Sequence, residues 1–288
     1  MRLSKNRLPL TICAAVLALA APILTACTRP DPESSAPAIE FFTTSFDLGD
    51  IGWMSEQADE YGVDLNVSGL RAIDKDVAFL FGDVRVAAGT IRSILLRTTD
   101  GGESWHEAMQ PVPGSELTHV SFSDPQHGWA LAQWAVESAG TILLFGSTDG
   151  GTTWRQLTQP HLSKAHAVPD GTPLSMKFTG ALNGELELAH DSESPSIDDT
   201  QAEIEVLASN DGGVTWSRVR RETRQWSPVE AQAKQSDRGF DNTDWEIDTR
   251  AAGEPISVRR FDREQNRWRV TTLPTHFRYQ GGRVLASP

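Results

Sequence analysis

Two kinds of hydrophobic pattern follow one another along the 288-residue chain. Residues 8–24 contain no charged side chain and are preceded by the basic residues Arg2, Lys5 and Arg7. After residue 40, apolar residues occur in short runs that are separated by polar, glycine-containing segments, a pattern that predicts β-strands joined by turns. The sequence therefore predicts a short apolar leader followed by an all-β domain.

The leader has the features of an export signal. A basic start followed by an apolar core is typical of signal peptides. The core contains Pro9 and Pro22, and it is shorter than the roughly 20 residues that a stable membrane-spanning helix needs. We therefore interpret this segment as a signal that is removed after export.

Residues 24–27 have the sequence Leu-Thr-Ala-Cys, which resembles the lipobox of bacterial lipoproteins. The resemblance implies that residues 1–26 are cleaved as a signal peptide and that Cys27, modified with lipid, becomes the first residue of the mature protein. Residues 27–39, rich in proline, serine and acids, are expected to form a lipidated flexible tether. An ordinary secretory signal and an uncleaved anchor are the alternatives.

These features also predict a location. Cys13 and Cys27 are the only cysteines in the sequence, so the mature chain would keep one acylated cysteine and form no intrachain disulfide. We expect the domain on the exported side of the bacterial cell envelope, attached to a membrane through the lipid on Cys27. Thr28 after the cysteine favours the outer membrane in a Gram-negative host.

An eight-residue segment occurs three times, at residues 98–105, 147–154 and 209–216. Each copy has Ser or Thr first, Asp third, Gly fifth, Ser or Thr seventh and Trp last. Asp-Gly-Gly between two strands predicts a hairpin turn, because glycine accepts positive φ and aspartate accepts backbone N–H bonds. The structural residues of the repeat are therefore Thr98, Asp100, Gly102, Trp105, Ser147, Asp149, Gly151, Trp154, Ser209, Asp211, Gly213 and Trp216.

These copies resemble the Asp-box, or BNR repeat, of sialidases, sortilin-type receptors and photosystem II stability/assembly factor-like proteins. The resemblance implies a β-propeller in which each box joins two strands of a four-stranded blade. An eroded fourth copy ends at Trp268, and the polar residues 192–199 and 225–239 are expected to be loops between strands. Residues 40–288 are therefore expected to form about five blades, with four or six as alternatives, and the first and last strands could share a blade and close the ring.

The charge of the chain limits its partners. With 26 basic and 39 acidic residues, its net charge is −13, which disfavours nucleic acid and anionic lipid surfaces. The last third is locally basic, and Arg218 with Arg220, and Arg267 with Arg269, are expected to share strand faces. They form either a patch for an acidic partner protein or solvated strand edges that prevent aggregation.

Catalytic motifs are not evident in the sequence. A sialidase needs a tyrosine nucleophile and an arginine cluster, but the chain has two tyrosines, Tyr61 and Tyr279, and lacks the Arg-Ile-Pro segment. Three early arginines (Arg71, Arg85 and Arg92) are expected to be ordinary surface or strand-end charges, and each box aspartate is used by its own turn. His161 and His166 do not have a zinc-binding spacing. We therefore predict no enzymatic activity, metal or cofactor.

Two functions remain open at this point. The resemblance to assembly factor-like proteins implies a membrane-anchored, non-catalytic module that binds an envelope protein or assists assembly. The alternative is an envelope glycoside hydrolase or glycan-binding lectin that uses the propeller channel. A hydrolase should bring acids and arginines together at the channel mouth, whereas a scaffold should present a broad surface patch.

Overall fold

The structure is a computed structural model that describes residues 37–43, 45–46, 62–86, 89–134, 142–157, 171–190, 201–225, 234–248, 255–280 and 283–286. The chain divides into two units, residues 1–36 and 37–288, and all described residues belong to the second. The predicted signal peptide, Cys27 and most of the predicted tether lie outside the described residues.

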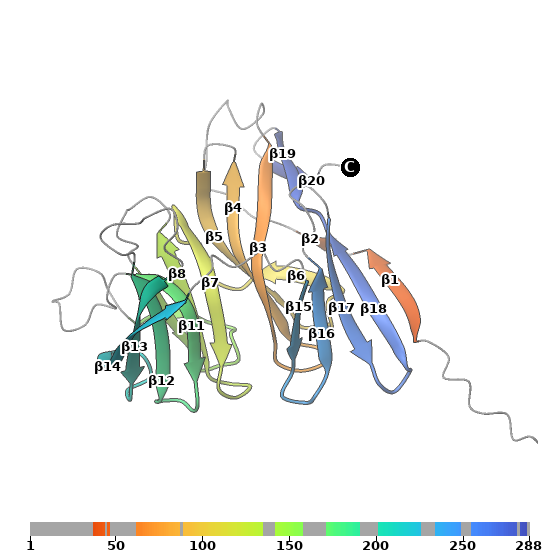
Figure 1. The fold of residues 1–288 in the computed structure, drawn as a ribbon. Helices are drawn as coiled ribbons and strands as arrows, with labels where there is room; N and C mark the ends of the chain where they lie inside the picture. The colour runs from red at the N-terminus through yellow and green to blue at the C-terminus, as the bar shows by residue number, and fades with distance from the viewer. Residues whose placement is uncertain are drawn as a thin grey trace, which may run out of the picture. The chain divides into compact units, whose positions relative to one another are not determined.

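Every regular element in the described ranges is a β-strand, and sixteen of the strands form four antiparallel sheets of four in sequence order (Figure 1). The first two sheets, here called blades, contain β3(Val63–Ala72), β4(Ala78–Val86), β5(Gly89–Thr98), β6(Ser104–Glu107), β7(Ser115–Phe122), β8(Gly128–Trp134), β9(Ile142–Ser147) and β10(Arg155–Gln156). The third and fourth blades contain β11(Thr172–Phe178), β12(Gly184–His190), β13(Gln201–Ser209), β14(Ser217–Gln225), β15(Lys234–Arg238), β16(Asp244–Asp248), β17(Ile256–Asp262) and β18(Arg267–Leu273). The predicted all-β fold with four-stranded, propeller-like blades is confirmed. Within the described ranges, no helix is long and apolar enough to cross a bilayer.

The first three blades share a backbone bond that shows their structural equivalence. In each, the first glycine of the repeated turn donates its N–H to the hairpin between the blade's first two strands. The bonds join Gly101 to Asp76 O (2.9 Å), Gly150 to Gln126 O (3.0 Å) and Gly212 to Leu182 O (2.9 Å). All three glycines have positive φ, between 68° and 77°, which a residue with a Cβ rarely adopts.

The fourth blade replaces this turn with a shorter one. β17 and β18 pair from Ile256↔Leu273 to Asp262↔Arg267, and Asn266 adopts a positive φ of 48° in the turn. The predicted fourth hairpin around Trp268 is therefore present. The interpretation of residues 225–239 as a loop is wrong in part, because β15 lies within this range.

The blades pack through apolar clusters that include residues of two neighbouring sheets. Trp105 of the first blade and Trp245 of the fourth are fully buried in one cluster. Phe79 and Phe122, of the first and second blades, stack with ring centroids 5.1 Å apart. Leu144 and Leu186, of the second and third blades, are buried together. The first blade therefore lies between the second and the fourth.

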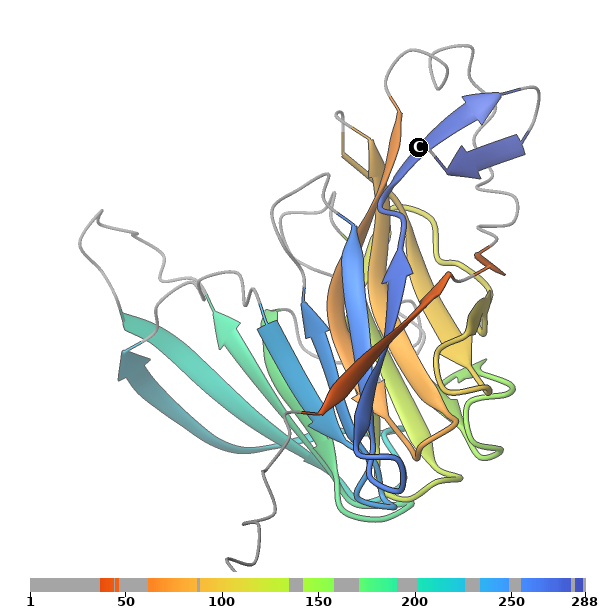
Figure 2. The ribbon, with the colours of Figure 1, turned by 90° about the vertical axis from the view of Figure 1, so that its right-hand side faces the viewer.

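The remaining strands extend existing blades. β1(Ala38–Thr43) pairs in parallel with β18, β2(Ser45–Phe46) pairs in parallel with β6, and the hairpin of β19(His276–Gln280) and β20(Arg283–Ala286) pairs with β3 (Figures 1 and 2). The last predicted strands thus join the first blade instead of forming a blade of their own. The described residues therefore form four blades, the lower end of the predicted range.

Candidate functional site

The blades carry polar groups at both ends, and the two ends are far apart. In the first blade, β5 begins near Thr90 and ends at Thr98, the first residue of the repeated turn. Eight residues of extended strand span about 27 Å. One end of the blade therefore holds the repeated turn, and the other holds a separate group of charged residues around Asp83.

We call this group the Asp83 cluster; its members are Asp64, Asn66, Asp83, Arg85, Thr90 and Glu116. Asp83 is fully buried. Its carboxylate accepts bonds from Asn66 Nδ2 (2.7 Å), Arg85 Nε (2.9 Å), Arg85 Nη2 (2.8 Å) and Thr90 Oγ1 (3.3 Å). The buried aspartate thus holds the half-exposed Arg85 guanidinium in a fixed orientation.

Strand register explains why these residues meet. Asn66 lies directly opposite Asp83 in the β3–β4 pair, and Asp64 lies opposite Arg85. Arg85 in turn pairs with Thr90 across β4 and β5. Because paired residues point to the same face of a sheet, the first three strands of the blade bring the cluster together.

Glu116 joins the cluster from the second blade. The chain before β7 is held along β5 by bonds from Gly114 N to Ile91 O (2.8 Å) and from Ser93 N to Val112 O (3.0 Å). Glu116 is the second residue of β7, the strand that packs against the first blade. The chain path therefore places this carboxyl group beside the end of β4.

The electrostatics of the cluster set Glu116 apart from Asp83. Burial and the nearby negative charge of Asp83 raise the pKa of Glu116, and the Arg85 cation only partly opposes this effect. The hydrogen bond to Asp83 raises the pKa of Arg85, so this side chain stays cationic. A carboxyl group with a raised pKa beside a fixed arginine is suited to proton donation and to binding polar ligands.

The aspartate of each repeated turn accepts several hydrogen bonds from its own turn. In the second copy, Asp149 Oδ1 accepts from Ser147 Oγ (2.8 Å) and Thr153 N (2.9 Å), and Asp149 Oδ2 accepts from Thr153 Oγ1 (2.7 Å). The Trp154 indole N–H closes the turn on Gly151 O (3.1 Å). Asp100 and Asp211 make the equivalent bonds. The donors around each aspartate come from its own segment.

Two arginines that we expected to be ordinary surface charges have structural positions, which corrects that prediction. Arg92 is buried and bonds Glu107 at 2.5 Å. Arg71 reaches Asp237 of the fourth blade (3.3 Å) and the carbonyl of Phe122 in the second (3.4 Å). Arg71 thus ties three blades together, and Arg85, the third of these residues, belongs to the Asp83 cluster.

The structure does not place Arg218 and Arg220 on one strand face, contrary to the prediction. The register of β13 and β14 shifts between Val206 and Leu207, next to these arginines. Arg218 contacts the buried Glu205, whereas Arg220 lies 3.8 Å from Glu187. These two glutamates point to opposite faces of the third blade, because Glu187 pairs with Val206, the neighbour of Glu205.

Arg267 and Arg269 lie on the fourth blade, on the face that packs against the first. Arg267 pairs with Glu40 of β1 (2.7 Å), and Arg269 pairs with Glu103 in the first repeated turn. The four arginines of the expected partner patch are thus divided between two blades, and each contacts a carboxylate.

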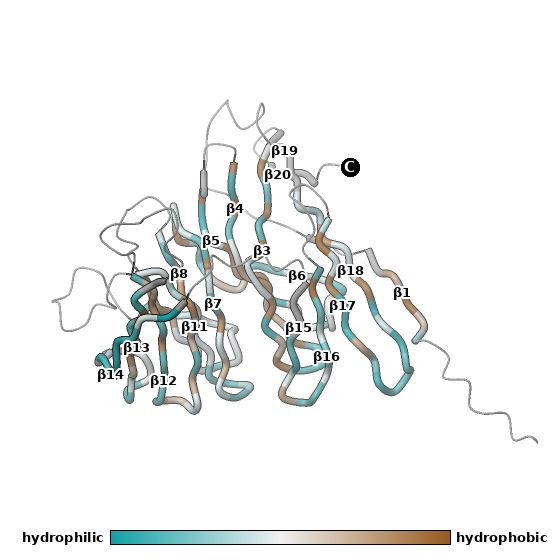
Figure 3. Tube along the Cα trace, in the orientation of Figure 1, coloured by the Kyte–Doolittle hydropathy of each residue, from teal (hydrophilic) through white to brown (hydrophobic). Residues whose placement is uncertain are grey.

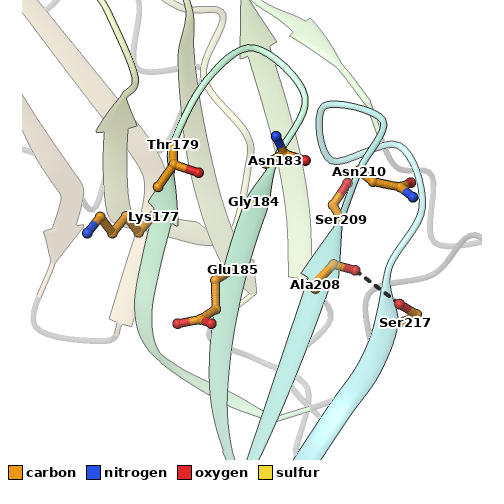
Figure 4. Close-up of a pocket in the computed structure, with 9 residues that line it drawn as sticks. All are labelled: Lys177, Thr179, Asn183, Gly184, Glu185, Ala208, Ser209, Asn210 and Ser217. Carbon is orange, nitrogen blue, oxygen red and sulfur yellow. Dashed lines mark hydrogen bonds between the residues drawn. The ribbon is translucent and has the colours of Figure 1, made fainter.

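A shallow pocket lies beside the third turn (Figure 4). It crosses one end of all four strands of the third blade and is lined by Lys177, Thr179, Asn183, Gly184, Glu185, Ala208, Ser209, Asn210 and Ser217. Ser217 Oγ bonds the carbonyl of Ala208 (3.4 Å), and the Lys177 side chain extends away from the other lining groups. The pocket contains one carboxylate, so it lacks the converging acids of the Asp83 cluster.

Other predicted candidates are not brought together. Tyr61, His161 and His166 lie outside the described residues, and Tyr279 is in β19. In the described part of the chain, no group of three or more His, Cys, Asp or Glu residues is placed to hold a metal ion.

The comparisons with known proteins concern the fold. No protein-family model and no curated protein sequence matches the chain. Similar solved structures include the GH74 xyloglucanase from Xanthomonas campestris, at 12% identity and a TM-score of 0.35, covering 77% of this chain and 34% of that chain. Another is the α-L-arabinofuranosidase from Fusarium graminearum, at 12% identity and a TM-score of 0.35, covering 86% and 77%. A protein of unknown function from Dyadobacter fermentans matches at 12% identity and a TM-score of 0.33, covering 74% and 70%.

The chain therefore spans about a third of the length of the xyloglucanase. Because glycoside-cleaving enzymes are among the similar structures, the prediction that the chain has no enzymatic activity is corrected.

Proposed function

We propose that this protein is an exported, lipid-anchored β-propeller that binds and cleaves a glycan of the cell envelope at the Asp83 cluster. The observation that carries the proposal is the proximity of a fixed cation, Arg85 near the end of β4, to a carboxyl group with a raised pKa, Glu116 at the start of β7. Converging acids and an arginine are what the hydrolase alternative requires.

The roles follow from the chemistry of glycoside cleavage. This reaction uses a proton-donating acid and a second carboxylate. Glu116, whose pKa is raised, is the proton donor. Asp64, opposite Arg85 in the β3–β4 pair, supplies the second carboxylate. The N–H groups of Arg85 that do not bind Asp83 can donate to sugar hydroxyls.

The repeated turns and the leader complete the proposal. We infer that the three turns are Asp-boxes. The chain would then resemble the Asp-box propellers, and the turns would have a structural role. The basic start, the apolar core and the sequence at residues 24–27 support lipid attachment at Cys27. The acidic surface agrees with a neutral or cationic ligand more than with an anionic one.

The test for the site uses purified protein and envelope polysaccharides, with binding and the release of reducing ends measured separately. Glu116→Gln should lower the rate of cleavage by about 10²–10⁴-fold while binding persists, because the amide cannot donate the proton. Glu185→Gln, at an exposed position of the third blade, is the matched control and should leave both unchanged. A wild-type protein that neither binds nor cleaves these glycans would refute the proposal.

The anchor is tested separately by Cys27→Ala. The wild-type protein should incorporate labelled palmitate and remain with the membranes, whereas the variant should be unlabelled and released into the exported fraction. Equal membrane retention of both forms, without label, would contradict lipid attachment.

A further inference from the structure

The fourth blade has an exposed apolar face that the Asp83 cluster does not use. β1 is the edge strand of this sheet, and its residues Ile39 and Phe41 are 57% and 74% exposed. They alternate with Glu40, which pairs with Arg267 toward the first blade. Ile39 and Phe41 therefore point away from the rest of the described fold, and Figure 3 shows the hydrophobic colour along this strand.

Strand register continues this face across the sheet. Ile39 lies opposite Trp268, which lies opposite Phe261. The rings of Phe261 and Trp268 are 5.1 Å apart, and the Arg259 guanidinium lies 5.6 Å from the centre of the Trp268 ring. Trp268 and Phe261 are half-buried. Ile39, Phe41, Phe261 and Trp268 thus form a continuous surface, here called the aromatic face.

The other side of the same sheet shows what a covered face looks like. Trp245, Val258 and Leu273 point toward the first blade and are buried in the cluster that contains Trp105. Isolated exposed apolar residues are normal on protein surfaces, but a contiguous aromatic group on an edge strand indicates a contact with another apolar phase.

We infer that the aromatic face rests on the surface of the membrane to which Cys27 is attached, an inference that rests on the proposed lipid anchor. The chain path supports lipid as the occupant. Cys27 is followed by a short segment that leads directly into β1, and eleven residues span at most about 40 Å. The length of this segment therefore limits the separation of β1 from the acyl chains to at most about 40 Å.

The chemistry of the face also fits a membrane interface. Tryptophan, phenylalanine and arginine combine apolar surface with groups that tolerate the headgroup region. The arginines bordering the face are paired with acids, as in Arg259–Glu246 (2.9 Å) and Arg263–Asp244 (2.5 Å). The contact is therefore apolar and not a basic patch for anionic lipids, in agreement with the net charge of −13.

The experiment places a polarity-sensitive fluorophore on single introduced cysteines of the full lipidated protein. Ile39→Cys is the test position, and Val219→Cys, 60% exposed on β14 of the third blade, is its matched control. Both proteins are reconstituted into phosphatidylethanolamine vesicles with brominated acyl chains. The label at position 39 should be quenched about twofold more than the label at 219, because bromine quenches within the apolar region.

Phe41→Ser in the labelled Ile39→Cys protein should remove most of this difference while circular dichroism remains unchanged. Equal quenching at positions 39 and 219, with lipid on Cys27 shown by mass spectrometry, would overturn the inference and leave the anchor in place. Absence of lipid on Cys27 would overturn the anchor instead. If position 39 is shielded from solvent in native envelopes but not in pure lipid vesicles, the inference of a membrane contact would also be overturned, in favour of a protein partner.

Discussion

The repeated turns and the Asp83 cluster both contain carboxylates, but at opposite ends of the blades these groups have opposite surroundings. Hydrogen bonds from Thr153 lower the pKa of Asp149 to about 2 in its turn, whereas burial and a second carboxylate raise the pKa of Glu116. Asp149 receives its donors from residues within four positions in sequence. Glu116 meets Asp83 only because two blades pack together.

This difference separates structural acids from candidate functional ones. A carboxylate surrounded by N–H and O–H donors is stabilised as the anion and has little capacity left for a ligand. A buried carboxyl group next to another negative charge has a raised pKa and is better suited to donate a proton. The two ends should therefore respond differently to mutation and to pH.

The largest effect is expected from Trp105→Ala, which removes the buried indole at the end of the first turn. Trp105 is fully buried with Trp245 between the first and fourth blades, so the loss of its contacts should lower the free energy of unfolding by about 3–5 kcal/mol. Denaturant unfolding measures this change. Glu116→Gln, at the other end, should change the stability far less, and a similar loss in both variants would remove the distinction between the two ends.

Two glycines provide the next comparison. Gly151 has φ of +74°, and a Cβ there would lie 2.3 Å from the buried Phe79 ring, whereas Gly114, before Glu116, has φ of +67° and open space. Gly151→Ala should therefore cost about 2–4 kcal/mol from strain and overpacking, and Gly114→Ala about 1 kcal/mol from strain alone. Thermal unfolding of both variants tests the difference, and equal losses would contradict the packing argument.

Asp83→Asn tests the cluster itself. The amide cannot accept the same bonds from Asn66 and Arg85, so the stability should fall by about 1–3 kcal/mol. Removing the negative charge should also lower the pKa of Glu116 toward its usual value, because that charge contributes to its elevation. NMR titration of carboxyl carbons measures the direction of the pKa change and identifies the carboxyl group in which it occurs. An unchanged Glu116 pKa would show that burial alone controls it.

The smallest effect is the pH dependence of the turns. Since the folded-state pKa of Asp149 is about 2 and its ordinary value is 3.8, its contribution to stability is fully present above about pH 4 and is lost as the pH falls toward 2. Asp149→Asn should flatten this part of the stability curve in urea unfolding at graded pH. Glu264→Gln, in the exposed β17–β18 turn, is the control and should leave the acid slope unchanged.

Much of the fold was predictable because its signals are local. The Asp-Gly-Gly segments marked three hairpins, and the apolar runs marked the strands on either side of them. The fourth blade was recognisable from Trp268 alone, although β15 was missed because Lys234–Arg238 is polar and resembles a loop. The prediction that Arg218 and Arg220 share a face was wrong because a register shift near Val206 moves them apart, whereas Arg267 and Arg269 do share a face.

The candidate site had only a faint signal in the sequence. Asp83 and Arg85 are two positions apart on a strand, so a shared face could have been inferred from strand periodicity. Nothing nearby in the sequence points to Glu116, which follows the repeated turn and a proline-containing connection. Its raised pKa depends on Asp83, 33 positions earlier, and on burial between two blades.

The sequence by itself determined the repeat, the four-stranded blade and the local chemistry of the turns, because each turn binds its own aspartate within a few residues. Only the tertiary structure decided that Asp83 and Glu116 share one environment, that Arg71 and Arg269 join blades, and that Ile39 and Phe41 remain exposed. The burial of these groups and the distances between their charges depend on which blades pack together. Hydrophobic packing selects these contacts, and no short sequence motif specifies them.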